Sequence, residues 1–235
     1  MFEIAQAQNE MIPYGKVGTI VQHCNVTPEM ENEISNRKKQ DICIGKEKLS
    51  ENSMKLLLNN DWLNDEIINA YLELLFNNAL GICLLNSFTI FPYNRSIEEL
   101  AVHAIRSRGV CRKISNKDCI VMPINDSQGK HWLLLVVHTS DRHIEVLDSL
   151  GKSLSTYTDL FKKVTLFLSA HLAVIDPSRS IDSFSWTISS PSLRDDFPKQ
   201  VDGINCGVFV AIFAKLAVHR TTNKQDTTLR DAQNE

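Results

Sequence analysis

The sequence predicts an α+β domain in which a central, mainly antiparallel sheet is flanked by helices. Two strongly apolar stretches, "DCIVMPI" (118–124) and "HWLLLVVH" (131–138), indicate strands. The second is nearly all apolar, as is typical of a strand buried on both faces. "HIEVLDS" (143–149) follows after a short polar connection, which favours a hairpin with the preceding strand. Long stretches with helical spacing precede and follow these strands.

The helices and the outer strands can be placed along the chain. "SENSMKLLL" (50–58) offers a serine cap before a short helix. "DWLNDEIINAYLELLFNNAL" (61–80) gives the clearest helix, which Asn64 or Asp65 can cap. The remaining predictions are helices in 96–109, in 154–172 and from Cys206 to about His219, and short strands in "SFTIFPY" (87–93) and "FSWTIS" (184–189).

Bulk composition narrows the class of protein. The 235 residues are 43% hydrophobic and 23% charged, which is ordinary for a globular protein. We expect a polar N-terminal extension (1–40), one patterned domain (41–220) and a polar, frayed tail (221–235). The net charge of −3 gives no reason to expect nucleic acid or an anionic membrane as a partner. No apolar run approaches the roughly 20 residues that span a bilayer.

The cysteines indicate a reducing compartment. Six are scattered without CxxC pairs, which argues against a zinc site and against a disulfide framework. We therefore expect no metal or other cofactor, and a location in the nucleus, the cytoplasm or both. We also expect a monomer.

One cysteine differs from the others in its setting. In "VDGINCGVFVAIFAK" (201–215), Gly203 and Asn205 are typical turn and cap residues, and a helix follows. Cys206 should therefore lie at a helix N-terminus, where the partial positive charge lowers the pKa of a thiol. A buried filler is the usual role of a free cysteine, so this position permits a nucleophile without requiring one.

A thiolate nucleophile also needs a base and a group that orients the base. His131 opens one apolar strand and Asp148 ends the next, so a hairpin brings both to the same end of the sheet. Gln200 lies six residues before Cys206, where its amide can donate to an oxyanion beside the thiolate. Taken singly, each has an ordinary structural explanation as a strand-end or turn residue.

Four segments together resemble one family. "DWLNDEIINAYLELL", "KHWLLLVVH", "IEVLDSLG" and "KQVDGINCGVFV" are similar, in this order, to the SUMO-specific (sentrin-specific) cysteine proteases, which are ubiquitin-like-protein proteases related to the adenovirus protease. The resemblance covers residues 41–220 and includes the 17-residue gap from His131 to Asp148. It implies a papain-like, adenovirus-protease-like fold and a catalytic domain over 41–220.

The resemblance also implies roles for individual residues. Cys206 corresponds to the nucleophile, His131 to the base, Asp148 to the orienting acid and Gln200 to the oxyanion donor. Trp62 and Trp132 match two tryptophans that clamp a Gly-Gly tail, and Asp65 matches a position near the modifier-binding surface. Core packing for the tryptophans and a helix cap for Asp65 are the alternatives.

The implied reaction is cleavage after the C-terminal Gly-Gly of SUMO, in precursors, in lysine conjugates, or in both. Two departures leave alternatives open. Asn205 stands where the family most often has aspartate, and the tail lacks the apolar and basic continuation that follows the last helix in the family. A protease for ubiquitin or another ubiquitin-like modifier, or a catalytically weak domain that binds such a modifier, are the alternatives.

Overall fold

The computed structural model describes residues 42–76, 81–89, 117–126, 131–176 and 185–232, with single positions at 79, 99, 114 and 178. Within α8 (Cys206–Ala232), side chains are described to Val218 and at Arg220. The predicted N-terminal extension (1–40) and nearly all of the predicted helix in 96–109 lie outside the described residues.

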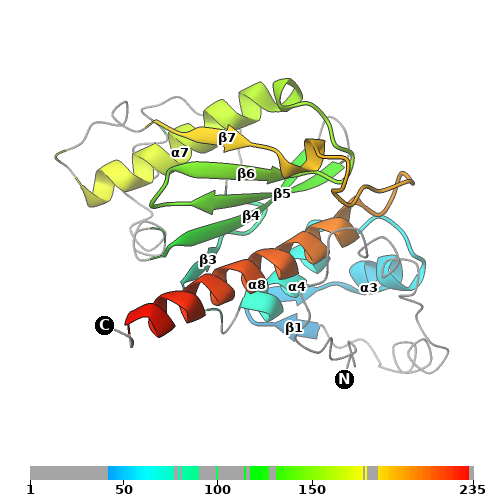
Figure 1. Ribbon diagram of the computed structural model, residues 1–235. Coiled ribbons are helices and arrows are strands. Elements are labelled where there is room, and N and C mark those ends of the chain that lie inside the picture. Colours follow the sequence, from blue (N-terminus) through cyan, green and yellow to red (C-terminus); the bar gives the residue numbers. More distant parts are fainter. Residues whose placement is uncertain are drawn as a thin grey trace.

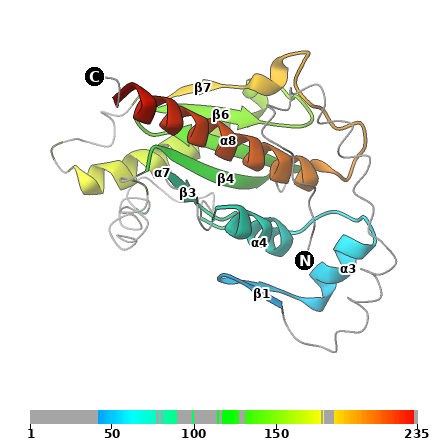
Figure 2. The ribbon, with the colours of Figure 1, turned by 60° about the horizontal axis from the view of Figure 1, so that its bottom comes forward.

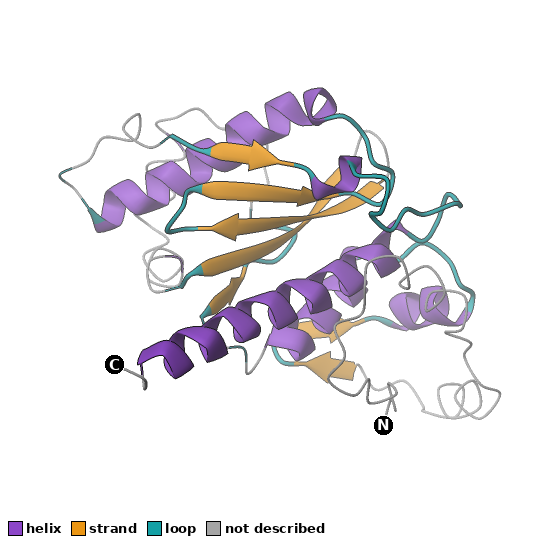
Figure 3. Cartoon of the chain, viewed as in Figure 1, coloured by secondary structure: helices purple, strands orange, loops and turns teal. Residues whose placement is uncertain are grey.

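A five-stranded sheet forms the centre of the fold, in the spatial order β3-β4-β5-β6-β7. The strands are β3 (Ile82–Leu84), β4 (Cys119–Asp126), β5 (His131–His138), β6 (His143–Leu147) and β7 (Thr187–Ser189). The three central strands are antiparallel, and each outer strand pairs in parallel with its neighbour. Figure 3 shows this mixed sheet with helices around it, which confirms the α+β prediction.

Helices cover both faces of the sheet. α7 (Thr158–Ile175), preceded by the 3-10 turn η2 (Leu154–Tyr157), lies on one face. α4 (Asp65–Phe76) and α8 lie on the other, so the fold has three layers (Figures 1 and 2). The sequence explains this, because side chains alternate between the two faces of a strand and β5 is apolar at nearly every position.

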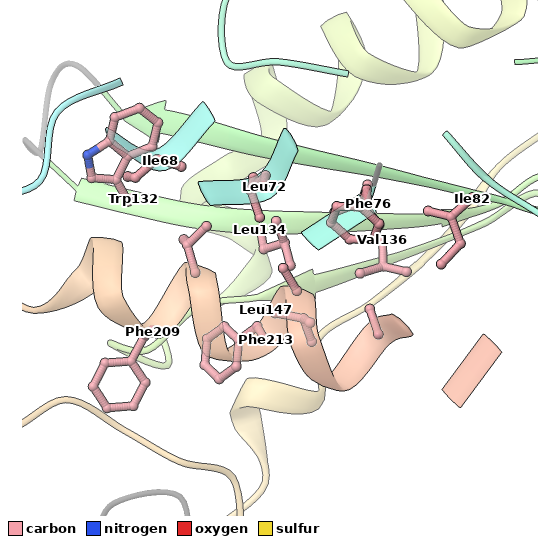
Figure 4. Packing of buried hydrophobic residues seen from close by; sticks show 14 of the residues in the cluster. Ile68, Leu72, Phe76, Ile82, Trp132, Leu134, Val136, Leu147, Phe209 and Phe213 are labelled. Atoms are coloured by element: carbon pink, nitrogen blue, oxygen red, sulfur yellow. The ribbon is translucent and has the colours of Figure 1, made fainter. Parts of the chain in front are cut away.

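Two apolar clusters result from this alternation. Leu134 and Val136 of β5 pack with α4 and α8, in the cluster shown in Figure 4. Leu133, Leu135 and Val137 point the other way and pack under α7. β5 therefore contributes side chains to both clusters. This packing fixes the position of His131, which is the first residue of β5.

A small subdomain packs against the outer side of α4. β1 (Ile42–Ile44) and β2 (Glu47–Leu49) form a hairpin that the sequence analysis did not predict, and α3 (Glu51–Leu58) follows it. The predicted serine cap is confirmed, since Ser50 Oγ accepts from the N–H of Ser53. Glu66 of α4 accepts from the Ser50 N–H (2.8 Å) and from the Ser53 hydroxyl (2.5 Å), which joins α3 to α4.

Two predictions about element bounds need correction. The strand predicted in 87–93 is wrong over its first three residues, because Ser87–Thr89 form a turn, closed by the Thr89 N–H on the Asn86 carbonyl, and residues 90–93 lie outside the described residues. The described strand nearby is β3, whose short apolar run does not distinguish strand from helix. α8 continues past the predicted end near His219 to Ala232. No proline or glycine follows Gly207, so nothing in the sequence stops the helix.

Close packing explains the glycine that follows Cys206. A Cβ atom at Gly207 would lie 2.9 Å from Leu63 Cβ, which is closer than such atoms approach, and 3.1 Å from Ile68 Cδ1, which is tighter than most such contacts. Leu63 belongs to the segment that leads into α4, so the absence of a side chain at Gly207 lets α8 begin directly against that segment.

We expect Gly207→Ala to destabilise the protein by about 1–2 kcal/mol. Overpacking a tight contact costs about 1–3 kcal/mol, and the better helix propensity of alanine recovers part of this. Gly203→Ala is the matched control, because nothing lies within 4 Å of a Cβ built there. Urea denaturation measures the free energy of unfolding of both variants, and equal values would contradict the packing explanation.

Candidate active site

The candidate active site lies where the start of β5, the end of β6 and the N-terminus of α8 meet. His131 is the first residue of β5, Asp148 follows the last residue of β6, and Cys206 is the first residue of α8. All three are buried, with exposed fractions of 2%, 0% and 2%. The hairpin that the sequence predicted is confirmed, and it brings His131 and Asp148 to the same end of the sheet.

His131 connects the other two residues. Its Nε2 lies 2.6 Å from Asp148 Oδ1. It also hydrogen-bonds the thiol of Cys206, and because Nε2 is taken by Asp148, the contact with sulfur falls to Nδ1. The three side chains therefore form a row of hydrogen bonds from carboxylate to imidazole to thiol.

Asp148 is a buried carboxylate surrounded by donors. Oδ1 also accepts from the N–H of Leu150 (2.8 Å), and Oδ2 accepts from the N–H of Lys152 and the hydroxyl of Tyr157 (both 2.9 Å). Burial raises the pKa of Asp148, but the hydrogen bonds from His131 and these backbone groups outweigh it and hold the pKa below its usual value. Asp148 is therefore a fixed negative charge at neutral pH.

The loop after Asp148 has the right shape to supply those donors. Gly151 donates its N–H to the Asp148 carbonyl (3.0 Å) and has a φ of +62°, a conformation that favours glycine. This turn directs the N–H groups of Leu150 and Lys152 back at the carboxylate. Ser192, in the 3-10 turn η4 (Pro191–Leu193), accepts from the Asp148 N–H (2.7 Å) and donates to the Val146 carbonyl (3.0 Å).

The charge of Asp148 sets the protonation of the other two groups. Burial lowers the pKa of His131, but hydrogen bonds to Asp148 and Cys206 outweigh it and raise the pKa to about 9. Burial raises the pKa of the Cys206 thiol, but His131 and the N–H groups of Trp132 and Gly207 outweigh it and lower the pKa. Both shifts favour the charged pair, a Cys206 thiolate beside a His131 imidazolium.

Gln200 is held close to Asp148 by Ser149, the residue that follows Asp148 in the chain. Its N–H donates to the Ser149 carbonyl (2.9 Å), and its Oε1 accepts from the Ser149 hydroxyl (2.6 Å). Its Nε2 donates to the Asp202 carbonyl (2.9 Å). The Gln200 amide, the predicted oxyanion donor, thus lies close to Asp148. One of its two Nε2 hydrogens is hydrogen-bonded to Asp202, and the second is available to another acceptor.

The turn before Cys206 is organised by Asp202 rather than by Asn205. Asp202 Oδ1 accepts from the N–H groups of Ile204 and Asn205 (both 2.9 Å), and Oδ2 accepts from the Asn205 side chain (2.8 Å). The Asn205 carbonyl then accepts the first bond of the helix, from Phe209. Asn205 lies at the predicted cap position, with its amide nitrogen turned back to Asp202.

The two predicted substrate tryptophans occupy different environments. Trp132 is 4% exposed and donates Nε1 to the Leu63 carbonyl (2.9 Å), so it packs in the cluster of Figure 4. Trp62 is half-buried and precedes Leu63, which contacts Gly207 beside the thiol. The segment 61–64 is therefore joined both to β5 and to the start of α8.

Asp65 is the first residue of α4 and is half-buried. Of the two predicted caps, Asn64 is the one that the structure shows, since its Oδ1 accepts from the Ile67 N–H (3.1 Å). Asp65 is therefore not needed as the side-chain cap of α4.

Several positioning residues were missed by the sequence analysis. Tyr157, Ser149, Ser192 and Asp202 each contact the row of predicted residues or the turn before Cys206. In the sequence, these residues are marked only by their closeness to the ends of predicted strands and helices. Many other polar residues lie in such places. Other described histidines are engaged elsewhere: His143 with Thr187 and Ser189, and His171 with the Phe167 carbonyl.

Among the residues that the structure describes, no three His, Cys, Asp or Glu side chains gather in a way that would hold a metal ion. No helix in the described part of the chain has the length and apolar content to cross a membrane. Cys43, Cys83, Cys119 and Cys206 form no disulfide bonds.

The fold and this row of groups are those of a cysteine protease. The model of the Ulp1 protease family, C-terminal catalytic domain, matches residues 61–234, and the chain belongs to this family. This is the family of ubiquitin-like-specific cysteine proteases that the sequence resemblance indicated.

Individual relatives agree with this. A sentrin-specific protease of Caenorhabditis elegans is 31% identical over 166 residues, which is 68% of this chain and 22% of that protein. Human sentrin-specific protease 2 is 27% identical over 199 residues, 80% of this chain and 32% of that protein. The chain thus spans about a fifth to a third of the length of these curated relatives.

Solved structures share the fold. The Ulp1 protease domain in complex with Smt3, the yeast ortholog of SUMO, aligns with a TM-score of 0.60 at 19% identity, over 83% of this chain and 85% of that one. The Ulp1-like SUMO protease catalytic domain of Chaetomium thermophilum gives a TM-score of 0.55 at 19% identity, over 82% and 79%. The predicted α+β fold, a central sheet flanked by helices, is therefore confirmed, and it is shared with Ulp1 catalytic domains.

We expect the alkylation rate of Cys206 by iodoacetamide to fall, as the pH is lowered, at a lower pH than the rate of an ordinary thiol. The lowered thiol pKa keeps the thiolate present down to that pKa, and the rate falls only when acid protonates it. His131→Ala removes the largest favourable contact, so its rate at pH 6 should fall at least tenfold.

Peptide mass spectrometry distinguishes Cys206 from the exposed Cys43, which serves as an internal control. Equal profiles for the two cysteines in the unaltered protein would contradict the ion pair.

Proposed function

We propose that this chain is a cysteine protease that cleaves after the C-terminal Gly-Gly of SUMO, through a triad of Cys206, His131 and Asp148. The observation that carries the proposal is the hydrogen-bonded row of these buried groups at the start of a helix. The family membership and the named substrates of the relatives support the same reaction. The bonds attacked are the peptide bond of a precursor, the isopeptide bond to a lysine, or both.

The proposed reaction is acyl transfer in two steps. The Cys206 thiolate attacks the carbonyl of the last glycine, and the negative charge that forms on its oxygen is stabilised by a Gln200 Nε2 hydrogen and a backbone N–H at the start of α8. His131 gives its Nδ1 proton to the leaving amine as the C–N bond breaks. Water then attacks the thioester and His131 accepts one of its protons. The C–S bond breaks, which restores the Cys206 thiolate, and the carboxylic acid that leaves gives its remaining proton to solvent. Neither step requires a metal ion or a cofactor.

Limited access to the nucleophile supports a Gly-Gly substrate. Cys206 and His131 are each 2% exposed, so a bulky peptide has no direct route to the sulfur. A chain of two glycines carries no side chains and fits a narrow approach that excludes other residues. We assign the walls of that approach to Trp132, beside the thiol, and to Trp62, on the segment that contacts Gly207.

A free thiol also suits the proposed setting. The reaction fails if Cys206 is oxidised to a disulfide, so we propose that the protein acts in a reducing compartment, the nucleus or the cytoplasm. We propose a monomer whose partners are SUMO, or another ubiquitin-like protein, and its conjugates.

Electrophilic probes test the nucleophile and the modifier together. We expect SUMO carrying a C-terminal vinyl sulfone to label the protein at Cys206, and Cys206→Ala to abolish both labelling and cleavage of a SUMO precursor. Cys43→Ala is the matched control and should keep full activity, because Cys43 is exposed in β1.

Each alternative gives a different result in this experiment. Labelling by a ubiquitin probe alone would replace SUMO by ubiquitin. Binding of SUMO without labelling or turnover would indicate a modifier-binding domain. Full cleavage by Cys206→Ala would overturn the assigned nucleophile.

Asp65 is the residue we assign to the modifier-binding surface. We expect Asp65→Ala to raise the KM for a SUMO precursor about 5- to 20-fold with little change in kcat, because a partly exposed carboxylate outside the triad contributes to docking rather than to chemistry. Thermal unfolding should be unchanged, since Asn64 provides the cap. Asp159→Ala, on α7 across the sheet, is the control. Unchanged KM for Asp65→Ala would remove Asp65 from the surface.

A further inference from the structure

The side chain of Gln200 is held at both ends. The Asp202 carbonyl can only accept a hydrogen bond, so the group 2.9 Å from it is the amide nitrogen of Gln200. The amide oxygen therefore faces Ser149, whose hydroxyl donates to it at 2.6 Å. Two independent partners thus fix the same orientation of the amide.

This orientation matters because an amide has two unlike ends. Turned one way, it presents an N–H to a developing oxyanion, and turned the other way, it presents an oxygen that repels that charge. The Ser149 hydroxyl stabilises the first orientation by holding the oxygen. The main-chain carbonyl of Ser149 accepts a hydrogen bond from the Gln200 N–H, so Ser149 holds the backbone of Gln200 as well as its side chain.

Ser149 is buried and adjacent to the acid. It is 1% exposed, so it is not placed to contact a modifier or its conjugate. It directly follows Asp148, so one turn of chain carries both the acid that orients His131 and the hydroxyl that orients Gln200.

We propose that Ser149 is a positioning residue for acyl transfer, whose hydroxyl fixes the Gln200 amide so that its N–H faces the oxyanion. The proposal rests on the proposed function, because it concerns the oxyanion of that reaction. It predicts that loss of the Ser149 hydroxyl affects the step that forms the oxyanion and leaves modifier binding and thiolate formation intact.

Ser149→Ala tests the proposal by comparing two reactions of the same thiolate. We expect kcat for cleavage of a SUMO precursor to fall about 5- to 30-fold with KM unchanged, which is less than the 100- to 1,000-fold typical of removing an oxyanion donor outright. Labelling by the SUMO vinyl sulfone should stay within about twofold of the unaltered protein, because that addition forms no tetrahedral oxyanion. Ser153→Ala, an exposed serine of the same loop that contacts Ser155, is the control.

A double-mutant cycle separates positioning of Gln200 from support of Asp148. In a Gln200→Ala background, Ser149→Ala should cost less than a further twofold in kcat. An undiminished loss in that background, or a parallel loss of vinyl sulfone labelling, would overturn the proposal, since either shows that Ser149 acts on the triad or on folding. Equal kcat for Ser149→Ala and the unaltered protein would overturn it as well. If the unaltered protein neither cleaves nor is labelled, the proposed function itself fails.

Discussion

The arrangement of the whole site depends on one buried charge, the carboxylate of Asp148. An ionised group with no exposure is costly unless donors surround it, and here His131, two backbone N–H groups and Tyr157 do so. Those donors come from the start of β5, from the loop after β6 and from η2, ahead of α7. The need to satisfy a single carboxylate therefore ties the sheet to the loop after β6 and to the segment that leads into α7.

The same charge also affects the protonation of the Cys206 thiol. With Asp148 ionised, His131 is stabilised as imidazolium, and the imidazolium in turn stabilises the Cys206 thiolate. Two negative charges and one positive charge then share a buried site. The N-terminus of α8, with its partial positive charge and the Gly207 N–H, offsets part of the remaining negative charge. A helix that starts at the cysteine is thus an electrostatic requirement as well as a way to position it.

Sequence patterns predicted the parts of the site that follow from regular structure. The apolar run of β5 and the alternation of β6 predicted a hairpin, and the hairpin is what brings His131 to Asp148. The helical spacing after Cys206 predicted the start of α8. Short elements were harder, because three-residue strands such as β1 and β3 have too few positions to show a period.

The hydroxyl groups could not have been predicted from local sequence. Ser192 reaches Asp148 across 44 residues and Gln200 reaches Ser149 across 51, and these contacts depend on how η4 and the following loop fold back over the sheet. A serine in a loop carries no periodic signal, and many loops contain one. Asp202 was missed for a related reason: a turn aspartate and a cap asparagine are both expected near a helix start, and only the geometry shows which one accepts the N–H groups.

Burial of the nucleophile links stability to selectivity under the proposed function. Leu63 packs so closely on α8 that Gly207 has no room for a side chain. The main-chain carbonyl of Leu63 also accepts a hydrogen bond from the indole of Trp132. These contacts keep the thiol in a dry site, where hydrogen bonds to the thiolate are strong. They also narrow the approach to the sulfur, so a substrate must present a chain without side chains. The packing that activates Cys206 therefore also restricts what it can attack, and a change that loosens Leu63 against Gly207 would weaken both properties at once.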